Sequence, residues 1–266
     1  MTRYLTTAYD ELRRSGVRGL KKSICRKFQL LYLEFVPLNV PLRMRRTVGG
    51  TTATFAIRTK RELQRVDNIM GEEHILEEIL GVLDDDDVFY DIGANIGCYG
   101  AFTGQCCETI AFEPHPENIL SLEQNVDLSK ASVDVFQLAL SDDSGTLPLR
   151  VSESGVPGAG QHSLGAEEDG IKVETRIGDN LIQEENIEPP TILKIDVEGA
   201  EGEVLRGLTE SLKEKDCHTI YCELHPQKMR KWDDTPDKLQ EFLKIKGFTI
   251  EEIPGERHHI HIRATK

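Results

Sequence analysis

The sequence predicts an α/β protein built on a doubly wound, mostly parallel sheet, with a helical extension at its N-terminus. Two observations support this fold class. From residue 88 onward, short apolar runs alternate with amphipathic segments long enough to form helices. The first of these runs ends in an acid and leads directly into a glycine turn. Repeated strand–helix units of this kind form a parallel sheet that helices cover on both faces.

The composition limits the domain number and the class of partner. At 266 residues the chain suits one α/β domain with an extension. The net charge is −14, although residues 1–46 carry eleven Lys or Arg against three Asp or Glu. An acidic body disfavours nucleic acid as a partner, because phosphate contacts need clustered cations. The six cysteines form no Cys-x-x-Cys pair, which predicts a reduced, cytoplasmic setting.

The extension, which we place at residues 1–60, has the pattern of a basic amphipathic helix over residues 14–35. Its apolar residues recur every three or four positions and share one face: Val17, Leu20, Ile24, Phe28, Leu31 and Phe35. Such a helix favours peripheral contact with an anionic membrane. The alternatives are a helix docked on the body of the protein or one that forms the seam of a homo-oligomer. Two prolines and the Gly49–Gly50 pair then predict a linker.

The main domain is placed at residues 61–266 and should begin with one or two helices over 62–83. The expected strands are 88–92, 109–113, 133–139, 191–196 and 218–224, and the expected helices lie near 96–105, 116–128, 200–213 and 236–246. Two shorter strand-like runs, 146–151 and 171–176, flank a glycine-rich loop at 152–170. The last two runs, 248–253 and 259–263, predict an antiparallel pair that turns at Pro254–Gly255.

The turn after the first strand reads Asp91-Ile-Gly93-Ala-Asn95-Ile-Gly97 and predicts a nucleotide-like ligand. Gly93 lets the backbone approach the ligand, and Gly97 lets the next helix pack close to the strand. The spacing differs from the Gly-x-Gly-x-x-Gly of dinucleotide sites, which disfavours a nicotinamide dehydrogenase. Asp91 repels phosphate but attracts an ammonium group, so the turn predicts S-adenosylmethionine as the cofactor. Asn95 either holds the cofactor carboxylate or adopts a left-handed conformation.

Polar residues also end the next two strands. Glu113 follows the second strand, about 20 residues after the glycine turn, where a carboxylate can bind ribose hydroxyls. The alternative is that Glu113 caps the helix beginning at Pro116. Ser141 and Asp142 follow the third strand and are candidates for the adenine edge of the cofactor. The carboxyl ends of parallel strands meet at one edge of the sheet, so these residues should gather there.

The last two parallel strands end in the candidate reaction centre. Asp196 and Glu198 follow the fourth strand, and His225 follows the fifth. Each of the three is a candidate for holding the acceptor or removing its proton, and imidazole titrates near neutral pH. A metal site from Asp196, Glu223 and His225 is chemically feasible, but no spacing in the sequence demands it. We therefore expect no metal.

These motifs resemble the FkbM family of S-adenosylmethionine-dependent methyltransferases. The similarity spans residues 72–250 and includes five segments: Asp91–Gly97, Ala111–Asn118, Ala139–Asp142, Gly160–Leu164 and Lys194–Glu201. The resemblance implies a Rossmann-like fold with seven strands, the last of them antiparallel. It also implies that Asp91, Gly93, Asn95, Gly97 and Glu113 bind the cofactor, while Asp196 and Glu198 line the reaction centre.

Members of the family mostly methylate oxygen, often in hydroxyls of sugars or natural products. We therefore expect an O-methyltransferase acting on a sugar, a glycan or a lipid-linked saccharide, in the cytoplasm and at most peripherally on a membrane. The first alternative is a small-molecule, natural-product O-methyltransferase. The second is a non-catalytic cofactor-binding module that serves in an assembly. The loop at 152–170 is expected to cover the acceptor.

Overall fold

A seven-stranded sheet forms the centre of the protein. The computed structural model describes residues 24–31, 33–34, 40–150, 163–165, 170–214, 216–254 and 260–266. The strands lie in the order β12 (Thr249–Ile253), β13 (Ile260–Thr265), β11 (Thr219–Leu224), β10 (Ile192–Ile195), β3 (Val88–Ile92), β4 (Glu108–Phe112) and β5 (Val133–Phe136). β13 runs antiparallel to both of its neighbours, while β11, β10, β3, β4 and β5 pair in parallel. The predicted fold class is confirmed.

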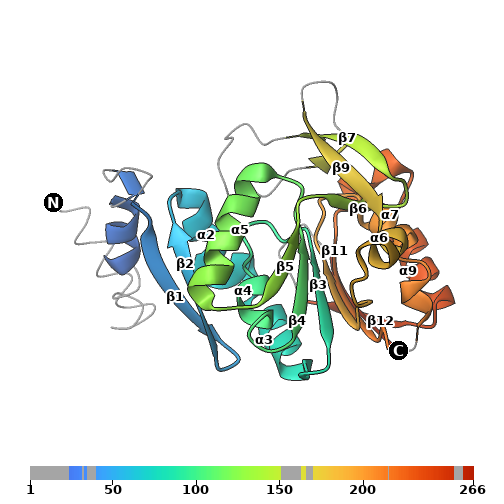
Figure 1. Ribbon diagram of the computed structural model, residues 1–266, viewed down its shortest axis with the longest axis horizontal. Coiled ribbons are helices and arrows are strands. Elements are labelled where there is room, and N and C mark those ends of the chain that lie inside the picture. Colours follow the sequence, from blue (N-terminus) through green and yellow to red (C-terminus); the bar gives the residue numbers. More distant parts are fainter. Residues whose placement is uncertain are drawn as a thin grey trace.

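Helices cover both faces of this sheet (Figure 1). One face carries α2 (Lys60–Asn68), α3 (Glu73–Val82), α4 (Gly100–Thr103) and α5 (Pro116–Ser129). The other carries α6 (Gly178–Glu185), α7 (Glu201–Gly207) and α9 (Pro236–Ile245), with the short α8 (Pro226–Met229) after β11. Three 3₁₀ turns complete the helical segments: η1 (Ile69–Gly71), η2 (Ser211–Lys213) and η3 (Arg230–Trp232). Side chains of β3 alternate between the two cores, with Phe89 in one and Tyr90 and Ile92 in the other.

Local capping explains why several helices start where they do. Thr59 and Glu62 form a reciprocal capping box at the start of α2. Pro116 is the first residue of α5, and His115 before it accepts a hydrogen bond from the Glu117 amide. Thr235 caps α9 in the same way. The helices predicted near 116–128 and 236–246 agree with these boundaries.

The last part of the predicted extension, residues 42–57, is a β-hairpin and not the linker that we predicted. β1 (Leu42–Val48) pairs antiparallel with β2 (Thr51–Ile57), and Gly49–Gly50 forms the turn with both φ angles positive. Phe55 and Ile57 are fully buried in the core beneath α3 and α4. The Ala56 amide also donates to the Asn125 side chain of α5 at 2.9 Å. The hairpin is thus an integral part of the folded body.

The described part of the predicted amphipathic helix is helical, at residues 24–31 and 33–34, while its residues 14–23, 32 and 35 lie outside the described chain. Leu30 and Leu33 pack against the core, and Arg26 forms an ion pair of 2.8 Å with Asp67. The predicted apolar stripe faces away from this contact, since Ile24, Phe28 and Leu31 are exposed. Within the described ranges, no helix is long and apolar enough to cross a membrane.

A second, four-stranded sheet lies beside the carboxyl edge of the main one (Figure 1). It contains β6 (Ala139–Ser141), β9 (Ile171–Ile177), β7 (Gly145–Arg150) and β8 (Ser163–Leu164). The strand predicted at 133–139 is therefore two strands, β5 and β6, which belong to different sheets. Of the predicted acceptor loop, residues 163–165 and 170 are described, and the remainder lies outside the described chain.

The ends of β3 and β10 are joined by an unusually close backbone approach. Gly93 follows β3 with a φ of 82°. A methyl group on this residue would overlap the carbonyl group of Asp196, which follows β10. Asp196 in turn donates its amide to Ile92 at 3.0 Å. Only glycine satisfies both the dihedral angle and the available space.

Replacing Gly93 by alanine should lower the free energy of unfolding by roughly 2–5 kcal/mol, because the new methyl adds a steric clash to the backbone strain. Gly50→Ala is the matched control. Gly50 also has a positive φ, of 86°, but its Cβ would meet open space. It should therefore lose only about 1–2 kcal/mol from the dihedral angle. Chemical denaturation of both variants measures the difference, and equal losses would contradict the steric explanation.

Candidate active site

The glycine turn holds three residues in positive-φ conformations at the carboxyl edge of β3. Gly93, Asn95 and Gly97 have φ angles of 82°, 53° and 77°. Asn95 is therefore left-handed, and its side-chain oxygen accepts from the amide of Ile96 at 3.0 Å. A Cβ on Gly97 would lie 3.0 Å from Leu122 of α5, so this glycine serves the packing of the turn against that helix.

Glu113 fixes the turn from the end of β4. Its Oε2 atom accepts from the Asn95 amide at 2.8 Å, and its Oε1 atom accepts from the His115 amide at 2.8 Å and from Asn118 at 3.3 Å. Burial raises the pKa of this carboxyl, although these hydrogen bonds oppose the shift. A carboxylate offers about four lone-pair positions, so roughly one remains on Oε2 for a further hydroxyl donor. Glu113 also lines the main cavity described next.

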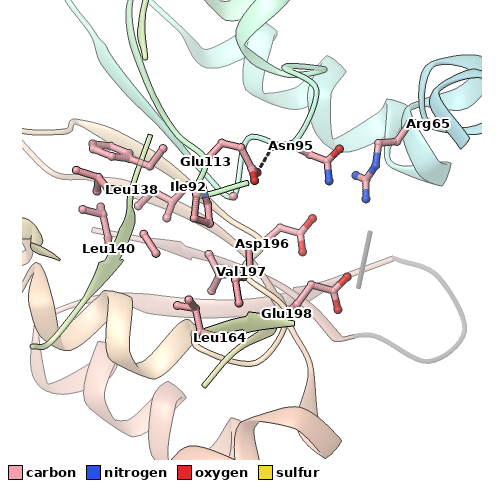
Figure 2. Close-up of a pocket in the computed structure, with 15 residues that line it drawn as sticks. Arg65, Ile92, Asn95, Glu113, Leu138, Leu140, Leu164, Asp196, Val197 and Glu198 are labelled. Carbon is pink, nitrogen blue, oxygen red and sulfur yellow. Dashed lines mark hydrogen bonds between the residues drawn. The ribbon is translucent and has the colours of Figure 1, made fainter. Parts of the chain in front are cut away.

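The main cavity lies at the carboxyl edge of the sheet and has an open volume of about 580 Å³ (Figure 2). Its apolar wall comes from the two sheets and the turn between them: Ile92, Phe112, Leu138, Leu140, Leu149 and Leu164. Its polar groups are Arg65, Asn95, Glu113, Asp196 and Glu198. A smaller neighbouring pocket shares Arg65, Gly93, Asn95 and Asp196 with it and extends toward Cys98, Tyr99 and Lys194.

Ser141 and Asp142 are not among the described residues that line this cavity, and their role at the cofactor stays a prediction. Ser141 is buried in β6, and its carbonyl packs so closely on Gly207 that a side chain there would overlap it. Asp142 accepts from the Arg206 guanidinium at 2.8 Å, within a network that includes Glu203 and Asp234. Residues 138–140 line the cavity, whereas the side chain of Asp142 is turned toward Arg206 of α7.

Asp91 is completely buried and sits behind the cavity wall. The Lys194 ammonium lies 3.7 Å from Asp91 Oδ1 and 3.6 Å from Asp196 Oδ2, and it stands 5.0 Å above the ring of Tyr99. Burial alone would lower the pKa of Lys194, but the surrounding carboxylates outweigh it and raise that pKa. For Asp196, burial opposes ionisation, yet Lys194 and His225 keep its pKa below the usual value. Lys194 therefore stays charged between two carboxylates.

His225 lies beside Asp196 and Glu198, which brings the three predicted catalytic residues together. The imidazole is only 3% exposed. Its Nδ1 atom is 2.6 Å from Glu201 Oε1, and its Nε2 atom is 3.4 Å from Glu198 Oε2 and 3.9 Å from Asp196 Oδ1. Burial lowers the pKa of His225, but the Glu201 bond and the neighbouring acids outweigh it and raise the pKa overall.

Sequence reasoning missed three site residues that come from outside the strand ends. Arg65 reaches the cavity from α2 (Figure 2), and Glu72 approaches from the start of α3. Tyr99 follows the glycine turn and donates its hydroxyl to Glu72 at 2.8 Å. Glu72 offered a signal in the sequence, because it is a charged residue between the apolar residues Ile69, Ile75 and Leu76. All four are buried in the structure.

Comparison with known proteins identifies the relatives of this chain. A family model described as Methyltransferase FkbM domain matches residues 91–250. The chain is 31% identical over 166 residues to the hexuronic acid methyltransferase AglP of Haloferax volcanii, covering 62% of this chain and 68% of that protein. It is 28% identical over 194 residues to the methyltransferase sdnD of Sordaria araneosa, covering 60% and 73%.

Among solved structures, the methyltransferase FkbM from Methylobacillus flagellatus KT is similar at 15% identity with a TM-score of 0.44, covering 77% of this chain and 55% of that one. The family match includes the glycine turn, Glu113 and the segment from Lys194 to Glu201. The family match extends over more than half of the chain. The chain belongs to the FkbM family and is an S-adenosylmethionine-dependent methyltransferase.

Proposed function

We propose that the main cavity binds S-adenosylmethionine and that the methyl group is transferred to a hydroxyl of a sugar, a glycan or a lipid-linked saccharide. One observation carries this proposal. The same cavity is lined by Glu113 and the glycine turn at one end and by Asp196 and Glu198 at the other (Figure 2). A cofactor held by the first group would thus present its reactive end to the second.

The residues fit the cofactor in chemical terms. Glu113 has capacity for a ribose hydroxyl, and Leu138 and Leu140 offer apolar surface to a purine. Gly93 and Asn95 would border the methionine portion in the smaller pocket, which also contains Lys194. We assign Asp91 and Gly97 to shaping this pocket from behind, since Asp91 is buried against Lys194 and Gly97 packs on Leu122.

When bound, S-adenosylmethionine supplies an electrophilic methyl group on a sulfonium. The protein's part is to align the acceptor oxygen with that methyl carbon and to receive the hydroxyl proton. Asp196, Glu198 and His225 are the groups placed for both tasks, and Glu201 holds the imidazole in orientation. The new C–O bond uses a lone pair of the oxygen, while the electrons of the broken C–S bond remain on sulfur.

The AglP relative, by its name a hexuronic acid methyltransferase, favours a sugar acceptor. The sdnD relative leaves the natural-product alternative open, because its printed name gives no acceptor. The buried charge cluster at the strand ends argues against the non-catalytic module. Burying several acids around one lysine and one histidine lowers the stability of the fold, so such a cluster is better explained by a role in catalysis.

We also propose that the extension brings this cytoplasmic enzyme into peripheral contact with anionic membranes. Ile24, Phe28 and Leu31 lie on one exposed face of the described helix, while Leu30 and Leu33 pack on the body. Docking on the body and contact with a membrane are therefore compatible, because they use opposite faces. Such contact suits an acceptor that carries a lipid.

Calorimetry should detect one binding site for S-adenosylmethionine on the wild-type protein. Glu113→Gln should weaken the affinity roughly tenfold, because one ribose hydrogen bond to a charged acceptor contributes about 1.5–3 kcal/mol. Asp142→Asn is the matched control and should bind normally, since Asp142 contacts Arg206 outside the cavity. Absence of heat with the wild-type protein, or a larger defect in Asp142→Asn than in Glu113→Gln, would contradict this assignment.

Mass spectrometry of candidate acceptors should show the gain of one methyl group on a hexuronic acid or a glycan that contains it. His225→Gln should lower kcat roughly a hundredfold or more, the usual contribution of a proton-transfer group, with cofactor affinity unchanged. Methylation confined to non-sugar alcohols would support the natural-product alternative. Normal cofactor binding without any methyl transfer across these acceptors would support the non-catalytic module.

Sedimentation with phosphatidylserine vesicles should recover the wild-type protein. A combined Ile24→Ser, Phe28→Ser and Leu31→Ser variant should bind at least about tenfold more weakly, because each side chain loses apolar area that the membrane would bury. Leu120→Ser is the control, as Leu120 of α5 is 68% exposed, the same as Phe28. Equal binding by the triple variant and the wild type would rule out this contact surface.

A further inference from the structure

Three potential metal ligands converge at the acceptor end of the main cavity. Asp196, Glu198 and His225 each offer one ligand atom, and these atoms lie within 4.8 Å of one another. Donor atoms about 2.1 Å from a common ion are themselves roughly 3–4.2 Å apart. The distances of 3.4 Å and 3.9 Å from His225 Nε2 to the two carboxylates fall in that range.

The orientation of His225 is the one that a metal-binding imidazole has. Glu201 is completely buried, and its Oε1 atom already accepts from the Gly199 amide at 2.9 Å. The Nδ1 atom of His225 lies 2.6 Å from the same oxygen, so Nδ1 carries the proton that is donated to it. Its Nε2 atom faces Asp196 and Glu198, so that the neutral form of the ring would direct its Nε2 lone pair toward them. A carboxylate that holds the far nitrogen is the common support of a metal-bound histidine.

Asp196 provides a second, independent indication. Its Oδ2 atom faces Lys194 at 3.6 Å, whereas its Oδ1 atom points toward His225. Oδ1 is a buried atom without a hydrogen-bond partner in the described chain. A buried carboxylate oxygen of this kind costs free energy unless a donor or a cation satisfies it. On the other side, Lys228 contacts Oε2 of Glu198, the same oxygen that lies 3.4 Å from His225 Nε2.

We propose that Asp196, Glu198 and His225 bind a divalent cation of the Mn²⁺ or Mg²⁺ class. Two carboxylates with one imidazole suit these hard ions, which also retain open positions for water or substrate. Asp196 and Glu198 line the main cavity, so the open positions face the space where the acceptor would lie. Resting on the proposed methyl transfer, the cation would hold the acceptor hydroxyl and lower its pKa. The hydroxyl proton would then leave to water, because Asp196, Glu198 and His225 serve as ligands in the cation-bound protein and no longer receive the proton directly.

A neighbouring cluster of Glu72, Glu223 and His261 has similar spacing and provides the internal comparison. Its three residues are all buried and line a smaller pocket, and Glu223 Oε1 lies 3.8 Å from His225 Nε2, so the two clusters are neighbours. Glu72 is engaged by the hydroxyl of Tyr99. None of the three is among the described residues that line the main cavity.

The test uses the full-length protein after chelation, without cofactor or acceptor, and titrates Mn²⁺ by electron paramagnetic resonance. We expect one Mn²⁺ per chain and nitrogen modulation in the pulsed spectrum from the imidazole. His225→Gln should abolish the modulation, and Glu198→Gln should weaken binding at least tenfold. Glu201→Gln should weaken it 10- to 100-fold, because the imidazole loses its support. His261→Gln is the matched control from the neighbouring cluster and should keep both the affinity and the nitrogen modulation.

Thermal melting of each variant confirms that it is folded before the titration is interpreted. Absence of Mn²⁺ binding by folded wild-type protein would overturn the proposal, as would loss of binding in His261→Gln with retention in Glu198→Gln. Calorimetry with S-adenosylmethionine on the same chelated sample keeps the two proposals separate. Cofactor binding without Mn²⁺ binding would refute the cation site alone, and the reverse result would refute the cofactor assignment alone.

Discussion

The buried ammonium of Lys194 is the constraint on which the whole site depends. It lies between Asp91, near the end of β3, and Asp196, which follows β10. The ring of Tyr99 covers it at 5.0 Å. Removing one member of such a buried group leaves an uncompensated charge, which is far more costly than the pair is stabilising. The ion pair with Lys194 helps to hold Asp196 beside Gly93, where Asp196 lines the main cavity. Lys194 itself is not among the described residues that line this cavity.

Much of the fold could be predicted from the chain because its signals are local. Buried runs ending in acids marked β3, β4, β10 and β11, and a proline at the first helical position marked α5. The hairpin β1–β2 was not predicted, although Gly49–Gly50 is a typical pair for a hairpin turn. Arg43, Arg45 and Arg46 of β1 entered the prediction only as part of the positive charge of residues 1–46. The three arginines weaken the apolar alternation by which a strand is recognised.

Backbone geometry alone predicts that Glu113, Asp196 and His225 lie at the sheet edge, and the structure places them there, while their roles stay predictions. The orientation of Asp142 was not predictable, because it depends on a partner far along the chain. Asp142 follows β6 of the four-stranded sheet, and its side chain contacts Arg206. Glu201 is a further example, since its contact with His225 joins residues 24 positions apart. Neither partner carries a sequence signal for the other.

The short turn from Glu198 to Glu201 supplies both a group that faces the cavity and the group that holds His225. Changes in its length would therefore disturb both at once. The four-stranded sheet contributes Leu149 and Leu164 to the cavity wall but no member of the buried ion cluster. Side chains of β7 and β8 can thus be varied to reshape the cavity without touching the buried ion cluster. The cavity therefore has a charged edge fixed by ion pairs and an apolar wall that is free of them.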